Sequence, residues 1–230
     1  MIPIALDLPA CGLRAFFYCG VYRGLMQQQK WTIERIYGRS SGAIIGLCIL
    51  CAFTDKDIVD IYQCIQEANR THYIVDCLYT TLATRLPPNA YAICSGRLFV
   101  TAAIMGCIPT TTSVFRDNVH LLDTIRSSGS IPFVTTSRLY LADHCPLPIL
   151  DGCFIDWLGN ARHLCGTCDG PAGCAHTKTL HVLRVSAPAS AWPGYIPVKA
   201  WCYPVTTVQL AVDMGMQFAV KSEFRWSHVR

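Results

Sequence analysis

The sequence predicts an α/β fold in which a sheet is covered by helices on both faces. Short apolar runs typical of buried strands alternate with longer segments whose apolar residues recur at helical spacing. The chain has 230 residues, of which 52% are hydrophobic and 15% charged, so it can bury a large core. No internal repeat or low-complexity linker divides it. We therefore expect a single domain over residues 1–230.

The predicted elements follow one another from the first residues onward. Strands are expected at residues 2–8, 33–37, 138–143, 148–151 and 180–185. Helices are expected at residues 13–28, 43–53, 55–67, 71–83, 96–107, 119–126 and 206–226. The strand segments are short and apolar, whereas the first helix carries Leu13, Phe17 and Val21 at helical spacing. Thr54 and Ser95 are the expected N-caps of the helices that follow them. Loops or turns are expected at 85–96 and 127–132, and an irregular or extended segment at 108–115.

Charge and apolar content limit the classes of partner. The net charge is +4 and the basic residues are scattered, so we expect no nucleic-acid partner. The longest apolar run, residues 43–53, is shorter than the roughly 18–20 residues needed to cross a bilayer. The first residues lack a basic secretory segment, and the 14 cysteines suit a reducing compartment. We expect an intracellular protein, cytoplasmic or peripheral on membranes.

Residues 38–42, Gly-Arg-Ser-Ser-Gly, match the Gly-x-Ser-x-Gly pattern of a nucleophile elbow. They lie between an expected strand and an expected buried helix. Such a turn exposes Ser40 and directs the start of the helix at the site, where its dipole favours a developing oxyanion. The α/β-hydrolase fold does not fit, because it places several strands before its elbow. The other oxyanion donors must then come from the earlier tight loop at residues 9–15, Pro-Ala-Cys-Gly-Leu-Arg-Ala.

The order and spacing of three motifs resemble those of the patatin-like phospholipases. The family's Gly-rich oxyanion loop corresponds to residues 10–15, its elbow to 38–42 and its Asp-Gly motif to 151–153. Residues 124–132 resemble the family segment that leads to the aspartate. The Cys-Gly pair at 11–12 is similar to the adiponutrin and triglyceride-lipase branch. The resemblance implies a three-layer α/β/α sandwich with a mostly parallel sheet.

The resemblance also implies the chemistry. Ser40 would attack an ester carbonyl, and Asp151 would act as the general base without a histidine, a cofactor or a metal. The substrate would be a lipid ester, taken from a membrane or lipid-droplet surface. The implied site residues are the dyad Ser40 and Asp151, the elbow glycines Gly38 and Gly42, and the oxyanion loop Cys11, Gly12, Leu13 and Arg14.

Alternatives to this mechanism and function remain open. Asp143 and Asp156 are rival acids, and a histidine after Asp151 could complete a triad. The histidines in that position are His163, His176, His181 and His228. The site could also serve lipid transacylation, or the fold could be inactive and bind lipid or a partner protein. Ala10 and Ala15 suggest inactivity, because they replace family glycines and alanine is strained where φ is positive.

One cysteine-rich segment has the spacing of a zinc site. Cys165, Cys168, Cys174 and His176 could together bind one tetrahedral ion, which would be structural. The alternative is a Gly- and Cys-rich loop in a chain already rich in cysteine. Cys153 replaces the small residue of the family's Asp-Gly motif, and its size makes it tolerable there.

Overall fold

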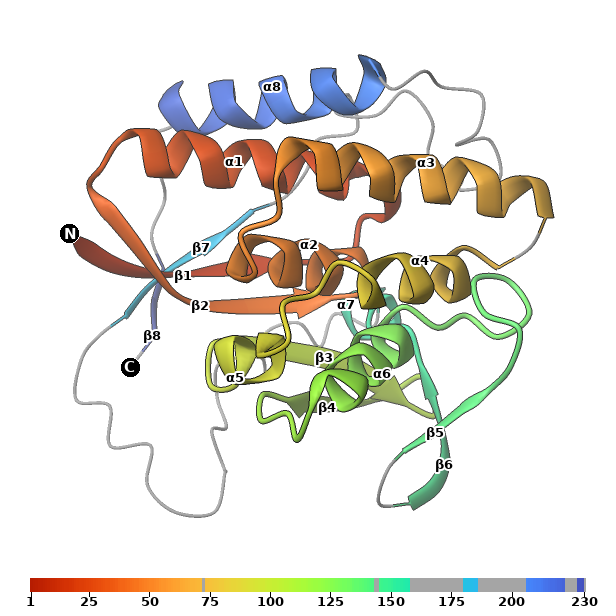
Figure 1. Ribbon diagram of the computed structural model, residues 1–230. Coiled ribbons are helices and arrows are strands. Elements are labelled where there is room, and N and C mark those ends of the chain that lie inside the picture. The colour runs from red at the N-terminus through yellow and green to blue at the C-terminus, as the bar shows by residue number, and fades with distance from the viewer. Residues whose placement is uncertain (72, 143–144, 158–179, 186–205, 222–226, 230) are drawn as a thin grey trace.

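The computed structural model describes residues 1–71, 73–142, 145–157, 180–185, 206–221 and 227–229 (Figure 1). These residues form an eight-stranded sheet of order β5-β6-β3-β2-β1-β7-β8, with β4 paired to β3. Helices pack on both sides of the sheet, which gives the predicted three-layer α/β/α fold. The strands are β1 (Ile2–Leu8), β2 (Trp31–Arg39), β3 (Leu98–Ile104), β4 (Ile108–Thr112), β5 (Tyr140–Ala142), β6 (Cys145–Leu150), β7 (Leu180–Arg184) and β8 (Ser227–Val229). The helices are η1 (Gly12–Ala15), α1 (Phe16–Gln27), α2 (Ser41–Leu50), α3 (Asp55–Thr71), α4 (Ile74–Ala83), α5 (Ala90–Cys94), α6 (Asn118–Ser128), α7 (Cys153–Trp157) and α8 (Thr206–Lys221).

The sheet is parallel at its centre and antiparallel toward its edges. β1 pairs in parallel with β2 and β7, and β2 pairs in parallel with β3. β4 and β6 run antiparallel to β3, as β5 does to β6 and β8 to β7. The carboxyl ends of β1 and β2 therefore meet at one edge of the sheet, where Leu8 is level with Gly38. The candidate site lies at this edge.

The largest error of the sequence prediction is at β3. Residues 96–107 were expected to form a helix capped by Ser95, but Leu98–Ile104 is a strand between β2 and β6. Most of its side chains are buried, so it lacks the alternation of a half-exposed strand and resembles a buried helix in sequence. The Ser95 hydroxyl instead donates to the Tyr91 carbonyl and accepts from the Phe115 N–H.

Other elements differ less from the prediction. β1 has the predicted bounds, and Thr54 exchanges hydrogen bonds with Asp57 as an N-cap of α3. The expected loop at 85–96 contains the short helix α5, and α7 and β8 were not predicted. The helix expected at 206–226 ends at Lys221 in the structure, and residues 222–226 are outside the described part of the chain.

Helix α8 packs along α1, far from it in sequence (Figure 1). The rings of Phe17 and Phe218 lie 5.6 Å apart, and the Gln28 side-chain amide donates to the Ala219 carbonyl at 2.8 Å. Two late elements are thus attached to the first strand and helix: β7 pairs with β1, and α8 packs on α1. Within the described ranges, no helix has the length and apolar character needed to span a membrane.

Candidate active site

The turn at Ser40 is a single residue wide. β2 ends at Arg39 and α2 begins at Ser41, so Ser40 alone joins strand to helix. Its backbone has φ 51° and ψ −124°, a conformation that non-glycine residues rarely adopt. Its carbonyl accepts the first hydrogen bonds of the helix, from Ala43 and Ile44. The turn therefore holds the half-buried Ser40 side chain apart from both elements.

The Ser40 hydroxyl contacts a carboxylate from a distant part of the chain. Its Oγ donates to Oδ2 of Asp151 at 2.7 Å. Asp151 is 4% exposed and directly follows β6. Its other oxygen, Oδ1, accepts from the Cys153 N–H at 2.7 Å, and its own N–H donates to the Ser130 carbonyl. The carboxylate is therefore held in one orientation, with one oxygen toward the serine.

The loop after β1 lies against the start of α2. The Cys11 N–H donates to the Ser41 hydroxyl at 3.2 Å, and the Arg14 N–H donates to the Cys11 carbonyl. Gly12 is exposed and has φ +58°. The 3₁₀ turn η1 begins at Gly12, so the N–H groups of Gly12 and Leu13 have no acceptor within that turn. Gly12 and Leu13 are two of the four predicted oxyanion-loop residues.

The elbow glycines are required by close packing. A Cβ at Gly42 would lie 2.0 Å from the Leu8 carbonyl oxygen, and a Cβ at Gly38 would lie 2.5 Å from the Cα of Ala43. Both distances are shorter than any real Cβ contact. The absence of these side chains lets the end of β1, the elbow and α2 approach one another.

A buried ion pair lies beneath the elbow, and the sequence analysis did not identify it. Arg39 is 0% exposed, and its guanidinium donates to Asp7 Oδ1 at 2.9 Å. Asp7 is on β1 and Arg39 on β2, so the pair joins the strand before the oxyanion loop to the strand before Ser40.

The Tyr18 hydroxyl supports the loop after β1, because it donates to the Pro9 carbonyl at 3.0 Å. Burial raises the pKa of Tyr18 well above its usual range, so this phenol stays protonated and remains a donor.

The patatin-like phospholipase family model matches residues 8–158, more than half of the chain. This protein belongs to the patatin-like phospholipase family. Membership supports a lipid acyl hydrolase in general, and makes a lipid substrate plausible. A comparison with curated proteins gives no match.

Some of the alternative acids and histidines of this patatin-like chain lie outside the described residues, and others lie within them. Asp143, His163 and His176 lie outside the described residues, as do Cys165, Cys168 and Cys174 of the suggested zinc site. Asp156 is on α7. His181 and His228 are paired across β7 and β8 and are level with Ile4 of β1. Ile4 lies four residues before the end of β1, about 13 Å along the strand from the candidate site. In the part of the chain that the structure describes, no cluster of ligands could hold a metal ion.

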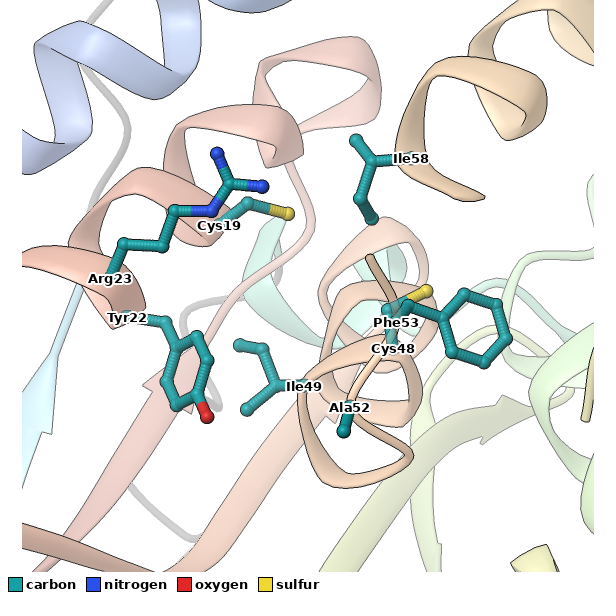
Figure 2. Close-up of a pocket in the computed structure, with 8 residues that line it drawn as sticks. All are labelled: Cys19, Tyr22, Arg23, Cys48, Ile49, Ala52, Phe53 and Ile58. Carbon is teal, nitrogen blue, oxygen red and sulfur yellow. The ribbon is translucent and has the colours of Figure 1, made fainter. Parts of the chain in front are cut away.

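A small hollow is present elsewhere in the patatin-like fold, between α1, α2 and the start of α3 (Figure 2). Its volume is about 40 Å³, and none of the predicted site residues lines it. Cys19 and Cys48 face it, and burial raises the pKa of the Cys19 thiol to about 12. A protonated thiol is a weak nucleophile, so this hollow has the character of a packing defect rather than a second reactive site.

Proposed function

We propose that this protein hydrolyses lipid esters through a Ser40–Asp151 dyad and an acyl-enzyme intermediate. The observation that carries the proposal is the 2.7 Å hydrogen bond from Ser40 Oγ to Asp151 Oδ2. A serine hydroxyl needs a base within hydrogen-bond reach before it can attack a carbonyl. Asp151 meets that requirement and is oriented by the Cys153 N–H.

The proposed reaction has two halves. Ser40 Oγ attacks the ester carbonyl carbon, and its proton passes to Asp151 as the oxyanion forms. Collapse of this intermediate breaks the ester C–O bond, and Asp151 returns the proton to the departing alcohol. Water then attacks the acyl-serine with Asp151 again taking the proton. Collapse of this second intermediate breaks the bond between Ser40 Oγ and the acyl carbon, Asp151 returns the proton to Ser40 Oγ, and the fatty acid leaves. The Gly12 and Leu13 amides and the start of α2 are the proposed oxyanion donors.

The structure does not support the reason for which a catalytically inactive fold was considered. The concern was that Ala10 and Ala15 occupy positions needing positive φ. Ala15 has φ −59°, and in the described part of this loop positive φ is found at Gly12. Alanine at the two positions therefore causes no backbone strain of the expected kind. We retain an active enzyme as the proposal, with acylglycerols or phospholipids as substrates, as in the adiponutrin and triglyceride-lipase branch.

We also propose that the substrate is taken from a membrane or lipid-droplet surface. Apolar side chains are exposed on the strand pair that leads to Asp151 and on the loop before it. Phe133 is 73% exposed and Leu141 56% exposed. Replacing both by serine should weaken cosedimentation with phospholipid vesicles and leave hydrolysis of a water-soluble ester unchanged. Equal vesicle binding by the variant and the wild type would refute this surface.

The dyad is tested by a panel of lipid esters with matched serine variants. Ser40→Ala should abolish hydrolysis and labelling by a fluorophosphonate probe. Ser41→Ala should keep a substantial fraction of both, because the Ser41 hydroxyl bonds to Cys11, whereas it is the Ser40 hydroxyl that bonds to Asp151. Asp151→Asn should fold but lose activity, since an amide cannot take the proton. Equal losses at Ser40 and Ser41, or an active Asp151→Asn protein, would contradict the proposal.

A further inference from the structure

We infer that Ser128 is a positioning residue that holds both members of the dyad in place. The inference rests on the proposed function, because it concerns the same site. Ser128 is the last residue of α6 and is 0% exposed. Its side chain bonds to the backbone of Ser40, and its carbonyl bonds to the residue after Asp151.

The Ser128 hydroxyl is oriented by a second partner. It donates its single proton to the Thr101 carbonyl at 2.6 Å. A hydroxyl has one donor and two lone pairs, so its oxygen is left to accept from the Ser40 N–H, at 3.0 Å. Thr101 is 1% exposed and lies on β3, beside β2. The direction of the bond to Ser40 is therefore fixed by the sheet itself.

Ser40 has a backbone conformation that needs such support. Its φ of 51° and ψ of −124° are sparsely populated for a residue with a side chain. Such conformations persist where the surroundings determine them from several sides. The N–H of Ser40 is held by Ser128, and its carbonyl is held by the first turn of α2. Without the Ser128 hydroxyl, the Ser40 N–H would lose this acceptor, and the backbone of Ser40 would be held only on its carbonyl side.

The backbone around Ser128 sets the position of Asp151. The Ser128 carbonyl accepts from the Gly152 N–H at 2.9 Å, and the Ser130 carbonyl accepts from the Asp151 N–H at 2.8 Å. The end of α6 thus lies between the elbow and the segment after β6. A shift of Ser128 would alter the distance between Ser40 Oγ and Asp151 Oδ2, which is the contact needed for proton transfer.

Ser127 provides a matched control in the neighbouring position. It is also buried, at 8% exposed, and its hydroxyl donates to the Thr124 carbonyl at 2.8 Å within the same helix. Replacing either serine by alanine removes one buried hydroxyl from the end of α6. Only the change at Ser128 removes a hydrogen bond to the elbow.

The experiment measures kcat and KM on a water-soluble chromogenic ester, with thermal unfolding as the folding control. Ser128→Ala should lower kcat about 100-fold with KM little changed, as expected for a misplaced nucleophile. Ser127→Ala should keep kcat within a few fold of the wild type. Ser128→Thr, which keeps the hydroxyl, should recover at least part of the lost kcat. A folded Ser128→Ala protein with wild-type kcat, or one that changes only KM, overturns the inference.

Two further measurements separate this inference from folding and from the dyad itself. If Ser128→Ala does not fold, Ser128→Cys tests the same bond, because a thiol has similar volume but is a weak acceptor. Wild-type kcat in Ser128→Cys would overturn the inference. If Ser40→Ala is inactive while Ser128→Ala and Ser127→Ala behave alike, the positioning role fails and the dyad stands. If Ser40→Ala remains active, the proposed function fails, and this inference fails with it.

Discussion

Gly42→Ala tests whether the loop after β1 must lie against the elbow for catalysis. The new Cβ would lie 2.0 Å from the Leu8 carbonyl oxygen and 3.0 Å from that of Pro9. Both partners are backbone atoms, so no flexible side chain can move aside. Relieving the closer contact requires a separation of at least about 1 Å between α2 and the end of β1. Displacements of about that size in an active site cost on the order of 100-fold in rate.

The expected result for Gly42→Ala is therefore a loss of kcat of about 100-fold. Forcing a methyl group into a packed contact also destabilises a protein by about 1–3 kcal/mol, so the melting temperature should fall without loss of the fold. Turnover of a soluble ester, fluorophosphonate labelling and thermal unfolding together separate the two effects.

Gly46→Ala is the control on the same helix. A Cβ there would lie 2.9 Å from Leu98 Cδ1 and 3.0 Å from Ile36 Cγ2, which are longer contacts than at Gly42 and involve side-chain atoms instead of backbone. Alanine also favours a helix interior over glycine by about 1 kcal/mol. We expect near-wild-type kcat for this variant. A folded Gly42→Ala protein that turns over ester as well as Gly46→Ala would refute the role given to the loop.

Three further predictions concern the surroundings of the site and the stability of the fold. Gly12→Pro removes a backbone N–H, and proline cannot adopt φ +58°, so ester turnover should fall by about 10²–10³-fold. Cys11→Ala should keep most activity. Similar turnover in folded samples of both variants would exclude this loop as the oxyanion hole. Asp7→Asn replaces the carboxylate beside the fully buried Arg39 guanidinium by a neutral amide, and should lower the free energy of unfolding by about 3–5 kcal/mol, to be checked by urea denaturation. No change would show the ion pair to be neutral for stability. Burial alone would raise the pKa of Asp76, but hydrogen bonds from a backbone N–H and from an arginine on α6 hold this pKa below its usual value. The stabilisation of the fold by Asp76 should therefore be complete above about pH 4 and be lost as the pH falls through the lowered pKa. Asp76→Asn should reduce the loss of unfolding free energy at acid pH, and an unaltered pH dependence would contradict the assignment.

The sequence predicted the fold where local patterns determine structure and failed where burial hides them. β1 is bounded correctly because a short apolar run precedes a Pro-Ala-Cys-Gly turn. β3 was predicted as a helix because helices packed against the sheet bury the side chains on both faces of this strand, which removes any alternation. What distinguishes this strand from a helix is its parallel pairing with β2, where Leu98 lies beside Ile36, a residue distant in sequence.

The candidate site was predicted at the level of motifs but not of the supporting contacts. The spacing of Ser40 and Asp151 matches a family pattern, and the structure places them 2.7 Å apart. Ser128 and Arg39 were not identified, although each lies within a recognised motif. Their contacts are with Ser40 and Asp7, across 88 and 32 residues of sequence. No local signal indicates which buried polar side chain will meet which partner after folding.

The departures from the family pattern are understood once each position is assigned a backbone requirement. Gly12 needs positive φ, and Gly42 needs the space that a Cβ would fill. Ala15 has an ordinary helical φ, so the glycine of the family pattern is not needed for conformation at that position. Cys153 acts on Asp151 through its N–H, which any residue but proline supplies. The motifs therefore constrain side-chain identity at the glycines with special geometry and at the two proposed reacting groups, Ser40 and Asp151. The chain departs from the family pattern at positions where only a backbone atom is used.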